Sequence, residues 1–246
     1  MPILTLLTDF GTADSYVAEM KAALLSRAPT ATLVDISHQI SPGDIRSAQY
    51  LLGRTWRQFP AGTVHLAVVD PGVGSERRAI AAESDSHRFV APDNGLLSFL
   101  PQDTKFVSLP TPADAAPTFH GRDLFSPAAA ALLTGAVLSS LGAVISDPYR
   151  SPLPTAYHDG TTVVGEVIYV DRFGTLISNI PGADVQRGVR VRVEGTDVGS
   201  LSRTFRDVAR GALVTFIGSG GTVEVAVRDG SAARRLGVGV GAEVRA

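Results

Sequence analysis

Three apolar runs in the first half of the chain each end in a polar loop, and this pattern restricts the fold more than any other feature. The runs are residues 3–8 (ILTLLT), 31–37 (ATLVDIS) and 63–70 (TVHLAVVD), and segments with apolar residues at helical spacing, 13–27 and 43–59, separate them. Continuous apolar runs are typical of parallel strands buried on both faces, and their alternation with helices favours a layered α/β sandwich. The polar loops then meet at the carboxyl edge of the sheet, where such folds bind ligands.

The second half of the chain changes character from about residue 161 onward. Short β-branched segments separated by glycines, such as TTVVGEVIYVDRFG and TVEVAVRDG, predict a small β-barrel or sandwich. The proline-rich residues 146–160 predict a linker. The sequence therefore predicts an N-terminal α/β domain with a mostly parallel sheet at residues 1–145 and a smaller barrel-like β domain at residues 161–246.

Composition excludes several classes of function. The 246 residues contain no cysteine, so thiolate catalysis and cysteine-ligated metals are excluded. A net charge of −2 gives no electrostatic basis for binding nucleic acid or an anionic membrane. No apolar run approaches the ~18 residues of a membrane span, and the first residues lack the basic region of a signal peptide, so we expect a cytoplasmic protein. Neither HExxH nor an EF-hand loop occurs, so we expect no metal site.

Two local patterns carry the polar residues that are suited to chemistry. Asp70 ends the third apolar run, and Arg77 follows it within one glycine-rich loop, PGVGSER, which is suited to close approach. His120 and Asp123 stand at the opening of an apolar helical segment, where backbone N–H groups favour anions. An equal alternative is that Asp123 caps this helix and His120 is a hydrogen-bonded loop histidine.

Six segments in order resemble the S-adenosyl-L-methionine hydroxide adenosyltransferase family, the hydrolytic relatives of the fluorinating and chlorinating enzymes. They are LLTDFGTADSYVAEMKA, VDISHQISPGDIRSA, VVDPGVGSERRAIA, VAPDNGLLS, TFHGRDLFSPAAA and VIYVDRFGTLISNI. The resemblance covers nearly the whole chain and implies hydrolysis of S-adenosyl-L-methionine to adenosine and L-methionine without a cofactor. Two features are those of the hydrolytic enzymes and not of the halogenating ones. The halogenating relatives lack the aspartate in DPGVG, and they carry an insertion before APDNG, where this sequence is short.

The resemblance implies that Asp70, Arg77 and His120 act on a water beside the 5′ carbon of the substrate. This assignment suits the chemistry, because a sulfonium is already an activated leaving group and needs no acid. The difficult part is aligning and activating a weak nucleophile. Asp70 is suited to accept a proton from the water, and Arg77 and His120 are suited to hold it and stabilise developing hydroxide.

The resemblance also implies eight substrate-binding residues: Asp9, Asp93, Asn94, Asp171, Phe173, Thr175, Phe205 and Ser219. Within this set, Asp9 matches the carboxylate that holds both ribose hydroxyls, and Asp171 matches the group that binds the methionine ammonium. Ser219 matches a residue near the methionine carboxylate. Phe173 and Phe205 are expected to line the adenine slot, although either also suits the core of a barrel.

Three departures from the family pattern fall in the second half. Thr175 stands where the family has an asparagine near the adenine, Gly218 and Gly220 flank Ser219 in place of larger polar residues, and VRDGS lacks the usual asparagine. They affect the expected adenine and methionine contacts more than the residues around the water. His38, in the DISHQI segment, is expected to be a structural histidine at a strand end.

The resemblance implies a homotrimer with sites at subunit interfaces. Three other functions stay open on the sequence: a halide adenosyltransferase of the same fold, a protein that binds adenosine or S-adenosyl-L-methionine without turnover, and a metal-dependent nucleoside hydrolase.

Overall fold

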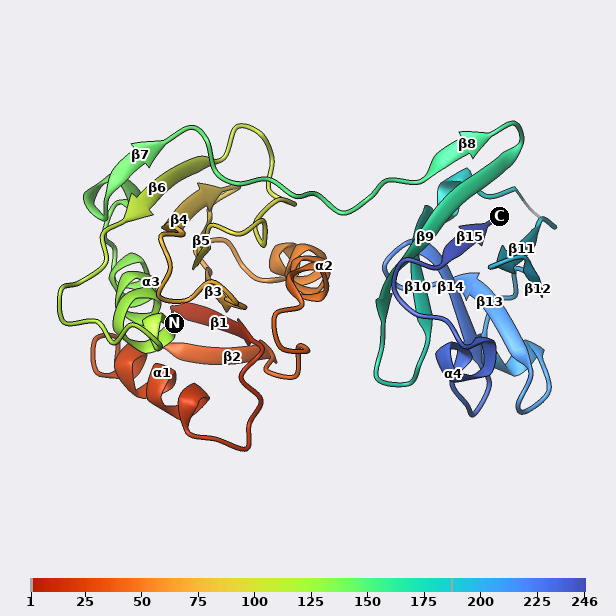
Figure 1. The fold of residues 1–246 in the computed structure, drawn as a ribbon, viewed down its shortest axis with the longest axis horizontal. Coiled ribbons are helices and arrows are strands. Elements are labelled where there is room, and N and C mark those ends of the chain that lie inside the picture. Colours follow the sequence, from red (N-terminus) through yellow and green to blue (C-terminus); the bar gives the residue numbers. More distant parts are fainter. Residues whose placement is uncertain (1, 187) are drawn as a thin grey trace. The chain divides into compact units, whose positions relative to one another are not determined.

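The computed structural model describes residues 2–186 and 188–246, and the contacts within it divide the chain into two compact units, Met1–Pro152 and Leu153–Ala246 (Figure 1). The division falls inside the segment 146–160. None of the helices in the described part of the chain has the length and apolar character needed to cross a bilayer.

The first unit is built on a seven-stranded sheet with the order β2-β1-β3-β5-β4-β6-β7. Its strands are β1 (Ile3–Thr8), β2 (Thr32–Ser37), β3 (Val64–Val68), β4 (Ala79–Ser84), β5 (His87–Pro92), β6 (Lys105–Leu109) and β7 (Ala143–Ile145). The neighbouring strands β2, β1, β3 and β5 pair in parallel, whereas β4 pairs antiparallel with β5 and β6, and β6 pairs antiparallel with β7. The predicted α/β class is confirmed, and its sheet is mixed because a tight β4–β5 hairpin reverses the chain.

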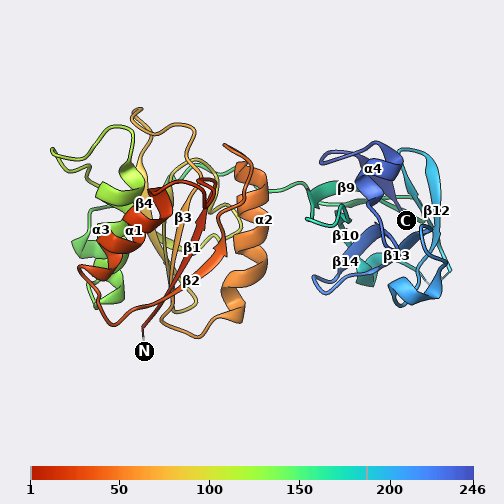
Figure 2. The same cartoon turned by 90° about the horizontal axis from the view of Figure 1, so that it is seen from below.

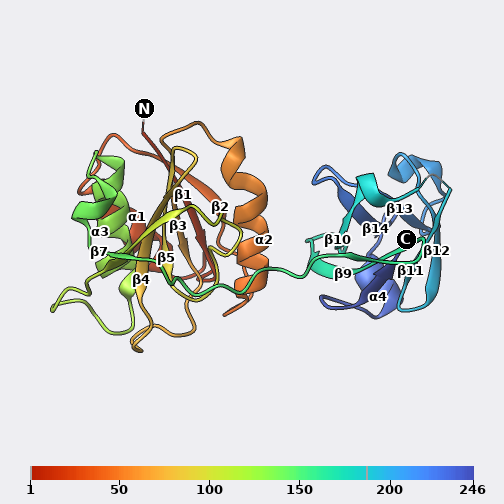
Figure 3. The ribbon, with the colours of Figure 1, turned by 90° about the horizontal axis from the view of Figure 1, so that it is seen from above.

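Three helices cover the two faces of this sheet and make it a layered sandwich (Figures 2 and 3). One apolar core joins the sheet to α1 (Tyr16–Leu25) and α3 (Ser126–Leu133), and a second core on the opposite face includes α2 (Ile45–Thr55). Helix α2 begins where the Asp44 carboxylate accepts the Ser47 N–H at 3.0 Å, as expected of an N-cap. Burial of both faces explains why the strand sequences are continuously apolar.

The second unit is an antiparallel sheet of eight strands, with the order β12-β11-β15-β9-β10-β14-β13 and β8 paired to β9. The strands are β8 (Tyr157–Asp159), β9 (Thr162–Val170), β10 (Leu176–Pro181), β11 (Arg190–Val193), β12 (Thr196–Ser200), β13 (Leu213–Ile217), β14 (Thr222–Val227) and β15 (Glu243–Arg245). A bridge between Leu201 and Thr215 links the two ends of the sheet and nearly closes it into the predicted barrel. The short helix α4 (Ala232–Leu236) was not predicted, and β8 lies within the segment predicted as a linker.

Side chains alternate between the two faces of each strand in this unit, and one of these faces forms the apolar interior. In β14, Val223, Val225 and Val227 enter the apolar core, whereas Glu224 and Ala226 lie on the other face. Both faces of β14 are buried, so the acidic side chain of Glu224 lies in a covered position rather than in solvent. This placement bears on the site described below.

Candidate active site

Strand pairing brings two acidic loop residues to one edge of the first sheet. Strands β1 and β3 are parallel with Thr8 opposite Val68, so the residues that follow them, Asp9 and Asp70, leave the sheet at the same edge. The loop after β2 reaches this edge as well, because the Gly43 N–H donates to Asp9 Oδ2 at 2.8 Å. The polar loops expected at the carboxyl ends of the parallel strands therefore do meet there.

Asp70, Arg77 and His120 form one continuous contact set at this edge. Arg77 Nε lies 3.0 Å from each oxygen of the Asp70 carboxylate, and Arg77 Nη2 also donates to Asp70 Oδ2. Arg77 Nη2 lies 2.9 Å from His120 Nδ1. The side chains of Asp70 and Arg77 are only 4% and 11% exposed. The three residues predicted to act on water are thus brought together, with the guanidinium between the carboxylate and the imidazole.

The contact with Arg77 determines how His120 carries its proton. A guanidinium only donates hydrogen bonds, so His120 Nδ1 must accept and the ring proton must be on Nε2. Burial and the positive charge of Arg77 lower the pKa of His120 below its usual value of 6.5. His120 is therefore a neutral hydrogen-bond donor through Nε2–H, and Asp70 is the one carboxylate of the set.

Two backbone features bring Arg77 and His120 into contact. Gly74 has φ of +77°, and a side chain there would place Cβ 2.7 Å from the carbonyl oxygen of Pro117, so glycine lets the Asp70–Arg77 loop lie against the segment before His120. A π-helical turn, Gly121–Phe125, follows His120 and precedes α3. Such turns are frequent at functional sites.

Asp123 lies in that π-helical turn and does not cap the following helix. Its Oδ2 accepts the Ala116 N–H at 3.0 Å, and its two oxygens accept from Arg122 Nε and Nη2. Arg122 also donates to Glu19 at 2.8 Å. The capping alternative for Asp123 is therefore wrong, since the carboxylate closes the loop ahead of His120 instead.

Asp93 and Asn94, which the resemblance assigns to substrate binding, are engaged within the first unit. Asp93 Oδ2 accepts from Arg78 Nε at 2.8 Å, and its Oδ1 accepts the Tyr149 N–H at 2.7 Å. Asn94 Nδ2 donates to the Val69 carbonyl at 2.8 Å. These bonds fix the loop that follows β5, and a direct contact of either residue with substrate stays a prediction.

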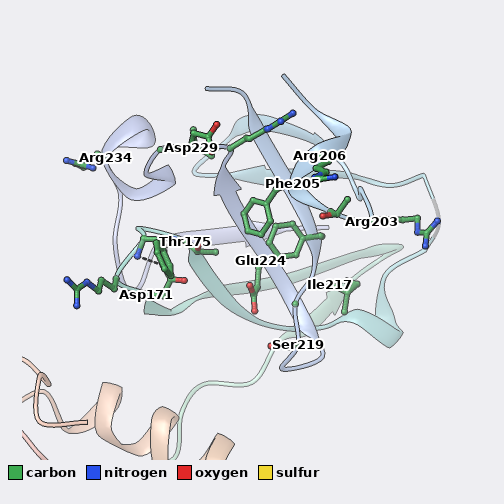
Figure 4. A pocket seen from close by; sticks show the side chains of 18 residues that line it. Asp171, Thr175, Arg203, Phe205, Arg206, Ile217, Ser219, Glu224, Asp229 and Arg234 are labelled. Atoms are coloured by element: carbon green, nitrogen blue, oxygen red, sulfur yellow. Dashed lines mark hydrogen bonds between the residues drawn. The ribbon is translucent and has the colours of Figure 1, made fainter. Parts of the chain in front are cut away.

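The second unit contains a pocket of about 1010 Å³ that is lined by the remaining predicted ligands (Figure 4). These lining residues are Asp171, Phe173, Thr175, Phe205 and Ser219. They come from the β9–β10 turn, from the segment between β12 and β13, and from the β13–β14 turn. Residues separated by up to 48 positions in the sequence therefore share one cavity.

The polar and aromatic groups of this pocket are held in distinct ways. Asp171 Oδ1 accepts the N–H groups of Phe173 at 2.9 Å and Thr175 at 2.8 Å, which fixes the β9–β10 turn. The Phe205 ring packs edge-on against Phe216, with 4.8 Å between ring centroids, and both line the cavity. Phe173 is 78% exposed, so it is not part of a barrel core. These rings give the cavity an aromatic wall suited to a flat heterocycle.

Glu224 is a pocket residue that the sequence reasoning missed. It is 9% exposed and lines the cavity, and in Figure 4 its carboxylate lies between Asp171 and Ser219. The carboxylate lies directly against Gly218, and a side chain at that position would require the carboxylate to move. The signal was available, because Glu224 is an isolated acid in the apolar strand sequence TVEVAV.

Charge around this pocket is the other feature that was not predicted. Five arginines contribute to its lining, namely Arg172, Arg203, Arg206, Arg228 and Arg234.

No metal site is found in the described part of the chain. Within residues 2–186 and 188–246, no group of three or more His, Asp or Glu side chains is arranged to hold an ion.

Comparison with protein-family models identifies the family of this chain. The model described as the SAM hydroxide adenosyltransferase N-terminal domain matches residues 4–142, and that of the corresponding C-terminal domain matches residues 165–245. The chain belongs to the SAM hydroxide adenosyltransferase family. The resemblance stated from the six sequence segments is confirmed.

Relatives within this family carry two kinds of names. A Thermus thermophilus protein named (R)-S-adenosyl-L-methionine hydrolase is 43% identical, with 97% of each chain covered, and a Salinispora tropica protein of the same name is 38% identical, with 99% of this chain and 97% of the relative covered. A fluorinase from Nocardia brasiliensis is 28% identical over 92% of this chain and 90% of its own. The similarity to the proteins named hydrolases is thus greater than to this fluorinase.

A solved structure confirms the fold of the family member described here. An uncharacterized conserved protein from Thermotoga maritima superposes with a TM-score of 0.90 at 33% identity, and 98% of each chain is covered. The layered α/β unit followed by a barrel-like β unit is therefore an arrangement that this chain shares with a crystal structure.

Proposed function

We propose that this chain hydrolyses S-adenosyl-L-methionine to adenosine and L-methionine. The observation that carries the proposal is the contact set of Asp70, Arg77 and His120 in a member of the SAM hydroxide adenosyltransferase family. The relatives' names refer to the (R) sulfonium epimer, and we propose the same epimer as the substrate of this chain.

In the proposed reaction a water oxygen bonds to the 5′ carbon of the ribose while the bond from that carbon to sulfur breaks. The electron pair of the broken bond goes to sulfur and gives neutral methionine thioether. Asp70 accepts the proton that the water loses, and solvent later receives it. Arg77 and the Nε2–H of His120 supply positive charge and a hydrogen bond where hydroxide character develops.

The substrate-binding roles form the second part of the proposal. Asp9 is assigned to the two ribose hydroxyls, because a carboxylate makes two strong charge-assisted bonds to a diol. In the second unit, the aromatic wall of Phe173 and Phe205 is assigned to adenine, and Asp171 and Ser219 are assigned to the ammonium and carboxylate of the methionine part. That these residues share one cavity supports the assignment. Thr175 lies in the same cavity, where it takes the place of the family's asparagine.

We propose a homotrimer with the active sites at subunit interfaces. The proposed ligands fall into two sets, one in each unit of the chain, as expected when a site is assembled from separate parts. Light scattering of the purified protein tests the assembly, and a fully active monomer would overturn it. A cytoplasmic location likewise remains a prediction.

The deciding experiment supplies the (R) and (S) sulfonium epimers separately to purified protein in oxygen-18 water. We expect adenosine from the (R) epimer, with the label on the 5′ oxygen and none in methionine. Asp70→Asn should lower turnover by ~100-fold or more, as for loss of a general base. Asp85→Asn, which alters an exposed ion pair with Arg57 elsewhere in the same unit, is the matched control and should leave turnover unchanged.

A halide transferase is the second candidate, because fluorinases are among the relatives. The negative charge of Asp70 beside the attack position argues against it, since that charge repels an incoming halide. The same assay with fluoride or chloride distinguishes the two functions. A 5′-halo product formed by the unmodified protein, or binding of S-adenosyl-L-methionine without turnover, would contradict the proposed hydrolysis.

A further inference from the structure

His38 holds the loop that carries Asp9 from both sides. Its Nδ1 lies 2.8 Å from the hydroxyl oxygen of Thr8, and its carbonyl oxygen accepts the Gly11 N–H at 2.8 Å. Thr8 and Gly11 flank Asp9 in the chain. One residue that follows β2 therefore fixes the backbone before and after the carboxylate.

The His38 imidazole is itself held in place. It is 4% exposed, and its Nε2 lies 3.2 Å from Asp35 Oδ1, while Asp35 Oδ2 accepts from Lys21 Nζ at 2.7 Å. The Thr8 hydroxyl oxygen also accepts the Phe10 N–H at 3.3 Å, so its own proton is available for Nδ1. The hydroxyl then bridges the histidine and the backbone of the Asp9 loop.

The same segment connects the Asp9 loop to the Asp70 loop. Five residues after His38, the Gly43 N–H donates to Asp9 Oδ2. A Cβ built on Gly43 would lie 3.7 Å from Cβ of Pro71, which is next to Asp70 in the chain. Residues 38–43 thus bind the Asp9 loop directly, at Thr8, Asp9 and Gly11, and pass close to the Asp70 loop.

We infer that His38 is a positioning residue for ribose recognition: through Thr8 and Gly11 it holds Asp9 in the orientation that accepts the two ribose hydroxyls. The inference rests on the proposed function, because it takes the substrate to be an adenosine derivative. It assigns a role to the DISHQI segment, which the sequence analysis treated as structural.

Strand β1 offers a matched control for the test. Thr5 Oγ1 lies 2.8 Å from His65 Nδ1, so the same strand has a second buried Thr–His bond of the same length, three residues earlier and remote from the Asp9 loop. Both threonines are fully buried. Thr8→Val and Thr5→Val therefore remove the same kind of bond, and only the first touches the proposed positioning contact.

The readout is the ratio of the dissociation constants of 2′,3′-dideoxyadenosine and adenosine, measured by calorimetry on the full-length protein. This ratio reports the contribution of the ribose hydroxyls and does not depend on turnover or on overall stability. For the unmodified protein we expect about 100, from two charge-assisted bonds at about tenfold each. Thr8→Val should lower the ratio about tenfold, whereas Thr5→Val should leave the ratio unchanged. Both variants should lower the unfolding temperature, because each loses one buried hydrogen bond.

The outcomes separate the positioning role from the function it rests on. A ratio near 100 in Thr8→Val would overturn the role of His38 while leaving the proposed function intact. A ratio near one in the unmodified protein would overturn the ribose assignment of Asp9 itself. If Thr8→Val does not fold, His38→Gln and His38→Asn replace it. The glutamine amide reaches toward Asp35 but loses the bond to the Thr8 hydroxyl, so His38→Gln should lower the ratio. The asparagine amide occupies the position of Nδ1 and keeps the bond to Thr8, so His38→Asn should preserve the ratio.

Discussion

Replacing Arg77 by methionine should destabilise the first unit strongly, because it leaves the Asp70 carboxylate buried without its charge partner. The Asp70 side chain is 4% exposed and receives hydrogen bonds from Arg77 Nε and Nη2. Methionine keeps much of the apolar stem but removes every donor. Breaking a buried ion pair from one side costs about 3–5 kcal/mol, which is a large part of the stability of a domain.

The single tryptophan of the chain provides the assay. Trp56 is 1% exposed and belongs to the core under α2, so its fluorescence reports unfolding of the first unit alone. With a urea dependence of about 2 kcal/mol per molar, the expected loss lowers the midpoint by roughly 1.5–2.5 M. Hydrolysis should be abolished in the same variant.

A double variant separates charge burial from catalysis. In Asp70→Asn/Arg77→Met the uncompensated charge is gone, so most of the lost stability should return while activity stays absent. A loss below about 1 kcal/mol in the single variant, or a double variant no more stable than Arg77→Met, would refute the reasoning from the buried pair. Retained turnover in Arg77→Met would refute the assignment of Arg77 to the reacting water.

Three further outcomes follow from the geometry. Burial and then the charge of His87 lower the pKa of the fully buried His65 from 6.5 to about 3. Between these two pH values the unfolded chain binds a proton at His65 and the folded chain does not, so the free energy of unfolding should fall by about 1.4 kcal/mol for each unit by which pH drops. Urea unfolding followed by Trp56 fluorescence measures this dependence, and His65→Asn should remove it. Asp9→Ala should weaken adenosine binding by about 2–4 kcal/mol and raise KM, as calorimetry and kinetics will show. Dialysis against a chelator should leave the hydrolysis rate unchanged, whereas a metal-dependent nucleoside hydrolase would lose activity.

The parallel part of the first sheet could be predicted because its cause is local. The runs at β1, β2 and β3 are mostly apolar, and helical segments separate them, which leaves few alternatives to parallel crossovers. The pairings of β4, β6 and β7 could not be predicted in the same way. The short strand β7 is the edge of the sheet and is mostly exposed, so its sequence carries little of the apolar signal.

The contact set around Asp70 needed the fold. Local patterns identify an acid at the end of β3 and a histidine before α3, but Arg77 and His120 are 43 residues apart. Their contact depends on the close approach that Gly74 allows and on the π-helical turn after His120. The family resemblance supplied this grouping, and residue spacing alone did not.

The second unit shows why a carboxylate can be overlooked even when its strand is predicted. Alternation along TVEVAV predicts one apolar face and one solvent face, and on that pattern Glu224 is a surface residue. In the structure Glu224 is paired with Phe216 of the neighbouring strand β13, and both line, with Phe205, a pocket rather than an open surface. The acid therefore belongs to the wall of a cavity, which the alternation along TVEVAV does not reveal by itself. The cavity that contains Asp171 and Ser219 is therefore the part of this unit where substitutions should change ligand affinity more than folding.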